Sequence, residues 1–77
     1  MAKHLADRQI GTRAVEELYR VFPYLPESKI AKRLGVDRKS FYEWKNGVTP
    51  SGHVLSALCF EGCDIKYILT GRRNNHE

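Results

Sequence analysis

Long apolar runs are missing from this chain of 77 residues. No hydrophobic stretch approaches the roughly 20 residues that a membrane-spanning helix requires, and residues 1–7 hold no apolar region of the kind found in secretory signals. The chain also has no internal repeat and no run of alternating apolar and polar residues, the pattern that predicts a strand. We therefore expect a cytoplasmic, all-α, single-domain protein that has no membrane partner.

Cysteine is scarce, since Cys59 and Cys63 are the only two. A disulfide between residues four positions apart would close a very small loop and would restrict the unfolded chain little. A zinc site would need His53 or His76 as a further ligand, and that arrangement fits no common finger pattern. We interpret both cysteines as reduced, partly buried thiols, and we expect neither a metal nor a cofactor.

Motifs that assemble catalytic sites are absent as well. Serine, histidine and aspartate residues occur in the sequence. No nucleophile motif, metal-ligand spacing or glycine-rich phosphate loop brings them together. We therefore expect that the protein is not an enzyme.

Net charge is concentrated in one short window. The whole chain carries a net charge of +4, and all of it lies within residues 29–46, because the segments on either side each balance to zero. The charged residues of the window are Lys29, Lys32, Arg33, Asp37, Arg38, Lys39, Glu43 and Lys45. A neutral body with one basic element indicates a surface that meets a polyanion.

Apolar spacing predicts a compact bundle of four to five short helices. We expect Thr12 to cap the first helix, which ends at Pro23. Residues 1–11 would precede it as an N-terminal arm or a short extra helix. Glu16 and Glu17 would then lie near the helix start, where the helix dipole favours acids. The buried stripe of this helix recurs at helical spacing and consists of Val15, Leu18, Tyr19 and Phe22.

Two further helices are predicted over residues 27–34 and 38–46, on either side of a glycine turn. Gly35 ends the first of them, because glycine adopts the positive φ that reverses the chain sharply. Asp37 is the expected N-cap of the second. The side chains expected in the core from this pair are Ile30, Ala31, Leu34, Phe41 and Trp44.

The last third of the chain predicts two more helices. Thr49 and Pro50 are the expected N-cap and first residue of a fourth helix, and a short fifth helix follows over residues 64–69. We interpret residues 72–77 as a solvated tail or the start of a linker. The fourth helix is expected to bury Val54, Leu55, Leu58 and Cys59. The tyrosines interpreted as packing residues are Tyr24 and Tyr67.

Two segments, IAKRLGV at residues 30–36 and SFYEWKNG at residues 40–47, resemble the helix-turn-helix of lambda-type phage repressors and Cro proteins. The stretches that follow, to Gly71, are similar to the end of phage repressor DNA-binding domains, so the resemblance covers residues 12–71. Two positions depart from the family pattern. Phe41 stands where a medium aliphatic residue is usual, and Glu27 stands where a glutamine commonly clamps a phosphate.

The resemblance implies a sequence-specific transcriptional regulator of double-stranded DNA, a repressor of phage or prophage type located at the bacterial nucleoid. The helix over residues 38–46 would enter the major groove of a (pseudo)palindromic operator. Base contacts are expected from Arg38, Lys39, Tyr42 and Glu43. Phosphate contacts are expected from Lys29, Lys32, Arg33, Lys45, Asn46, Thr49 and Ser51. A homodimer is expected on DNA, through Ile65, Tyr67, Ile68 and Leu69.

A protein-interaction module, such as an antitoxin or an assembly adaptor with a helical groove, is the alternative function of the same bundle. Salt separates the two functions, because affinity for DNA falls steeply with salt as counterions are released. Affinity for a protein partner held by apolar contacts does not. The chain is expected to be either a complete Cro-like protein or the DNA-binding part of a longer repressor.

Overall fold

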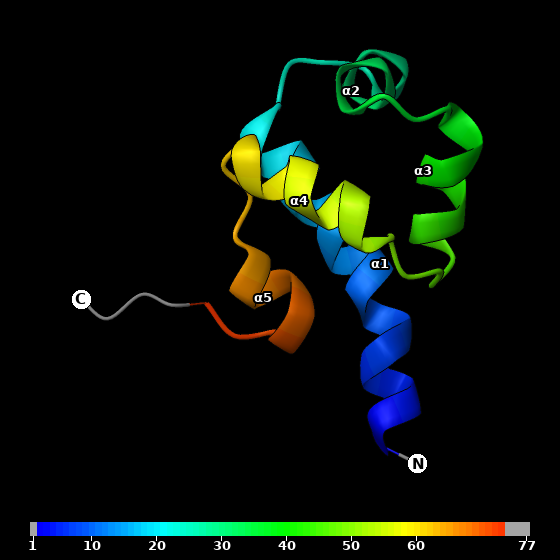
Figure 1. Ribbon diagram of the computed structural model, residues 1–77, viewed down its shortest axis with the longest axis vertical. Helices are drawn as coiled ribbons and strands as arrows, with labels where there is room; N and C mark the ends of the chain where they lie inside the picture. The colour runs from blue at the N-terminus through cyan, green and yellow to red at the C-terminus, as the bar shows by residue number, and fades with distance from the viewer. Residues whose placement is uncertain (1, 74–77) are drawn as a thin grey trace.

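The computed structural model describes the backbone of residues 2–73 and the side chains of residues 9–73. The helices of this part of the chain are α1 (Ala2–Val21), α2 (Glu27–Leu34), α3 (Arg38–Lys45), α4 (Gly52–Phe60) and α5 (Ile65–Thr70) (Figure 1). No strand occurs among these residues, so the predicted all-α bundle is confirmed. Residues 1 and 74–77, which fall in the expected arm and tail, lie outside the described residues.

α1 is the longest helix and underlies the rest of the bundle. It packs against α3 and α5, while α2 packs against α3 and α4, and α4 packs against α5. Figure 1 shows α1 passing behind α4, with its first turns extending beyond the other helices, and α2 and α3 with axes in clearly different directions. The core consists of Ala14, Val15, Leu18, Ile30, Ala31, Leu34, Phe41, Trp44, Val54, Leu58, Cys63 and Ile68.

The start expected for the first helix is wrong. Thr12 does not cap a helix, because α1 runs without a break from Ala2, and residues 2–11 form its first half rather than a separate arm. The Thr12 hydroxyl donates back to the Gln9 carbonyl oxygen at 2.9 Å. Glu16 and Glu17 therefore lie in the middle of a long helix and gain nothing from its N-terminal dipole.

Gly11 explains why a glycine sits inside α1 although it costs a helix about 1 kcal/mol. A Cβ atom at this position would lie 2.3 Å from the carbonyl oxygen of Val48 and 2.5 Å from that of Trp44. Any side chain would collide with the backbone of the end of α3 and of the loop after it. The glycine is a close-approach residue, and sequence analysis had placed it at the edge of the domain.

The turn between α2 and α3 is formed as predicted. Gly35 adopts φ 78° and its amide donates to carbonyl oxygens of the last turn of α2. Asp37 caps α3 by accepting a hydrogen bond from the Ser40 amide at 3.0 Å. That bond lowers the pKa of the Asp37 carboxyl, since it favours the charged form.

α4 begins two residues later than predicted. Ser51, not Thr49, is its N-cap, and the Ser51 hydroxyl accepts from the Val54 amide at 3.3 Å. Cys59, expected in the core, is exposed, whereas Cys63 just beyond the helix is buried. Burial disfavours the thiolate and raises the pKa of Cys63 to about 11. Cys59 follows the buried Leu58 directly, so its side chain points about 100° away around the helix.

Two tyrosine assignments are wrong. Tyr24 was interpreted as a packing residue, but 94% of its surface is exposed in the connection between α1 and α2. Tyr19 was expected in the buried stripe of α1, yet it is 43% exposed. Its ring still touches the core, because the centroid lies 6.3 Å from that of Phe41, while its hydroxyl reaches solvent and the start of α2.

Candidate nucleic-acid interface

The inner side of α3 is fixed by two aromatic rings. Phe41 is 1% exposed and Trp44 is 4% exposed, as predicted. Their ring centroids lie 5.6 Å apart in an edge-to-face arrangement, which is the geometry that aromatic pairs prefer. Because both rings point into the bundle against α1, the opposite side of α3 is turned to solvent.

The four predicted base-contacting residues share that outer side. Arg38, Lys39 and Tyr42 are exposed, and Glu43 is half-buried. At 100° per residue, the four positions span an arc of about 140° on α3. Among the residues that the structure describes, none of these four side chains has a hydrogen-bonding or ion-pairing partner. Sequence periodicity therefore brought these residues to one surface correctly, while their role stays a prediction.

The three predicted phosphate contacts on α2 fall into two groups, according to whether a carboxylate pairs with them. Lys29 and Lys32 lie exposed on α2, and no carboxylate among the described residues pairs with them. Arg33 instead pairs with Glu61 at the end of α4, with 3.0 Å between Nε and Oε1. Its guanidinium also lies 5.1 Å from the centre of the Phe22 ring. Arg33 thus ties α2 to α1 and α4.

The remaining phosphate candidates lie at and after the end of α3. The side-chain Nδ2 of Asn46 donates to the Tyr42 carbonyl oxygen at 2.8 Å at the last turn of α3. Thr49 is exposed in the loop that follows, and Ser51 is occupied as the cap of α4. The Asn46 and Ser51 side chains stabilise helix ends in the structure, so a phosphate contact from either would use its other hydrogen-bonding positions.

Lys45 meets a carboxylate that sequence analysis had left without a partner. Its ammonium Nζ lies 2.5 Å from Oε2 of Glu27, the first residue of α2. The Tyr19 hydroxyl of α1 donates to the same Glu27 oxygen. The hydrogen bonds from Lys45 and then Tyr19 lower the pKa of Glu27, and the pKa values of Lys45 and Tyr19 rise in return. The feature of the sequence that could have indicated this contact is the acidic Glu27 at the start of α2, whose other charged residues are all basic.

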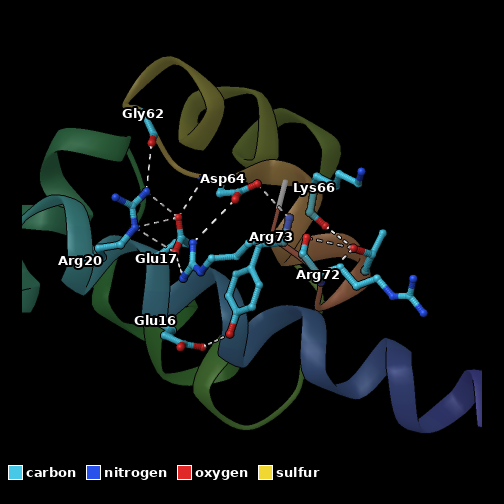
Figure 2. A network of polar contacts seen from close by, with 10 residues as sticks. Glu16, Glu17, Arg20, Gly62, Asp64, Lys66, Arg72 and Arg73 are labelled. Carbon is cyan, nitrogen blue, oxygen red and sulfur yellow. Dashed lines mark hydrogen bonds and ion pairs between the residues drawn. The ribbon is translucent and has the colours of Figure 1, made fainter. Parts of the chain in front are cut away.

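A second polar cluster lies on the far side of α1, around Glu17, which is 0% exposed (Figure 2). Arg20 donates to Glu17 at 2.8 Å, Arg73 donates at 2.7 Å, and the Asp64 amide donates at 2.8 Å. The Arg20 bond, followed by those from Arg73 and Asp64, lowers the pKa of Glu17 to about 2 despite its burial. The burial of Glu17 could have been predicted from its position among Ala14, Leu18 and other apolar residues on one side of α1.

Arg73 lies near the start of residues 72–77, the segment interpreted as a solvated tail or the start of a linker, and its side chain contacts the helix bundle. Besides its pair with Glu17, its guanidinium lies 4.1 Å from the centre of the Tyr67 ring, and 3.6 Å separate its Nη1 from Oδ2 of Asp64. The Tyr67 hydroxyl in turn donates to Glu16 on α1 at 2.6 Å. The described part of this segment is therefore held against α1 and α5.

The expected dimer surface on α5 is not a continuous apolar face. Ile68 is 0% exposed and belongs to the core, so it cannot meet a partner. Ile65 is partly buried against that core, and Tyr67 is occupied by Glu16 and Arg73. Leu69 alone of the four is exposed, at 44%. The helical period of α5 turns Ile65 and Ile68 toward the core. The predicted dimer surface rested on the number of apolar residues in this helix and not on the side of the helix that they occupy.

No family model matches the chain, and no curated protein or solved structure matches it either. Among the described residues, no helix combines the length and the apolar character needed to cross a membrane. Within the same part of the chain, no three histidine, cysteine, aspartate or glutamate side chains gather as metal ligands would. The α2–α3 surface is therefore the feature of the molecule that bears on its function.

Proposed function

We propose that this protein is a sequence-specific regulator of transcription that binds double-stranded DNA, a repressor of phage or prophage type acting at the bacterial nucleoid. One observation carries the proposal. α3 is held from behind by Phe41 and Trp44, while Arg38, Lys39 and Tyr42 stand exposed on its outer side. An α-helix fits the major groove of B-DNA, where base edges present distinct donors and acceptors.

Electrostatics support this surface as the one that meets DNA. Two of the six cations in residues 29–46 are neutralised by carboxylates, Arg33 by Glu61 and Lys45 by Glu27. The other four, which are exposed and have no carboxylate partner among the described residues, are Lys29, Lys32, Arg38 and Lys39. If each neutralises one phosphate, the logarithm of the binding constant falls with the logarithm of the salt concentration with a slope of about −3 to −4 per domain.

Each outer residue of α3 has a chemical task in this proposal. Arg38 grips guanine O6 and N7 in a bidentate way, and Lys39 reads neighbouring acceptors. Glu43 accepts from cytosine N4, while Tyr42 lies on a thymine methyl group or a phosphate. Because one helix meets only a few base pairs, two copies bind half-sites about one helical turn apart.

Selection of bound duplexes from a random pool tests the proposal. The selected sequences report affinity, motif and two-fold symmetry together. Arg38→Ala is expected to cost about 1–3 kcal/mol on the selected duplex and to relax preference at one position. Arg72→Ala is the matched control, because this exposed arginine lies outside the basic window. Equal losses on selected and random duplexes would show that Arg38 does not read bases.

Salt tests the alternative of a protein-interaction module. Binding to duplex DNA that weakens by the slope given above supports the proposal. A domain that retains no duplex from the pool at low salt would refute it and leave the protein-interaction module as the function to pursue.

A further inference from the structure

The contact between Glu27, Lys45 and Tyr19 joins three helices at the edge of the proposed DNA surface. Glu27 is the first residue of α2, Lys45 is the last residue of α3, and Tyr19 comes from α1. Both Lys45 and Tyr19 reach the same oxygen, Oε2 of Glu27. We infer that Glu27 is a positioning residue that sets the orientation of α3 for base recognition, and that Lys45 serves this contact rather than a phosphate. This inference rests on the proposed function.

The placement of the contact explains why it controls orientation. Phe41 and Trp44 hold α3 by apolar contact on one side, and apolar packing is not directional. The Glu27–Lys45 pair adds a directional bond at the C-terminal end of α3. Tyr19 restrains the Glu27 carboxylate, and its ring also touches Phe41. The polar contact and the aromatic contact are therefore coupled through Tyr19.

Charge gives a second reason for the pair. A carboxylate beside the DNA surface repels phosphates, although Glu27 is favourable at the N-terminus of α2 because of the helix dipole. Lys45 neutralises Glu27, so the start of α2 keeps its acid without presenting a net negative charge to DNA. The pair then contributes to the shape of the surface rather than to its net charge.

The specificity ratio, which is the affinity for a selected duplex divided by that for a random duplex, tests this inference. A lost phosphate contact weakens both duplexes alike, whereas a misplaced α3 weakens the selected duplex more. The ratio also does not depend on the fraction of folded protein. The variants are Tyr19→Phe, Glu27→Gln, Lys45→Gln and the double variant Glu27→Gln/Lys45→Gln. Lys32→Gln is the control, as an exposed lysine that has no carboxylate partner among the described residues.

We expect each single variant to lower the specificity ratio by about two- to fivefold, the scale of a partly exposed ion pair. The double variant should lower it no further than either single change, because the two residues act as one unit. Tyr19→Phe carries particular weight, since it removes one hydroxyl and alters no charge. Lys32→Gln should weaken both duplexes and leave the ratio unchanged.

Two results would overturn the inference in distinguishable ways. If Lys45→Gln weakens both duplexes equally while Glu27→Gln strengthens both, Lys45 is a phosphate contact and only the positioning role is wrong. If the unaltered protein shows no preference for any duplex, the proposed function fails, and the positioning role fails with it.

Discussion

Removing the charge of Glu17 is the perturbation for which the structure gives the clearest magnitude. Its carboxylate is buried and accepts hydrogen bonds from Arg20, Arg73 and the Asp64 amide. These bonds bring its pKa from the ordinary 4.5 to about 2, a difference worth about 3 kcal/mol. Both arginines remain partly in water, which screens the pairs. We therefore expect Glu17→Gln to lower the free energy of unfolding by about 2–3 kcal/mol.

The pH dependence of that loss identifies its cause. The folded pKa of Glu17 lies below the unfolded one, so its contribution to stability is complete above about pH 5 and disappears as the pH falls from 4.5 towards 2. Urea unfolding followed by circular dichroism at several pH values measures the difference between parent and variant. Glu16→Gln, a neighbouring exposed glutamate, is the matched control and should cost less than about 1 kcal/mol. A Glu17→Gln loss that stays constant from pH 7 to pH 2 would refute the electrostatic reasoning.

Three further predictions concern packing and reactivity. Gly11→Ala should destabilise the protein by about 1–3 kcal/mol in urea unfolding, because the new Cβ would meet backbone oxygens. Gly52→Ala is the control and should be neutral, because a Cβ there meets open space. Equal effects of the two changes would contradict the close approach at Gly11. Trp44→Ala should cost about 3–5 kcal/mol, and a cooperative melt near the parental temperature would contradict its core position. At pH 8, iodoacetamide should modify the exposed Cys59 far faster than the buried Cys63, whose pKa is raised to about 11. Mass spectrometry measures the two rates, and equal rates would show that Cys63 is accessible.

Local signals accounted for the α2–α3 unit within a residue. Gly35 and Asp37 act on backbone groups only a few positions away, so their effect can be inferred from neighbouring residues alone. The start of α4 was missed by two residues, because Thr49 and Ser51 are both good caps and only the fold selects Ser51. The start of α1 was missed because Gly11 lowers helix propensity locally. The glycine is required by a contact with the end of α3 and the loop after it, which lie far along the chain.

Long-range charge partners could not be predicted from the sequence. Helical period was enough to bring Arg38, Lys39 and Tyr42 to one exposed surface. The partners of Arg33 and of Glu17 lie far along the chain, at Glu61 and Arg73. Which cation pairs with which acid depends on how helices pack, and nothing in a short window of sequence encodes that. Arg33 and Lys45 therefore have carboxylate partners that the sequence alone did not indicate.

The contact at Gly11 has a mechanical consequence. Where two segments meet through side chains, rotamer changes absorb small displacements, but at Gly11 the main chain of α1 lies directly on that of Trp44 and Val48. Gly11 contributes no side chain that could adjust its rotamer at this contact. A displacement of α1 at Gly11 therefore meets the main chain at the end of α3 directly.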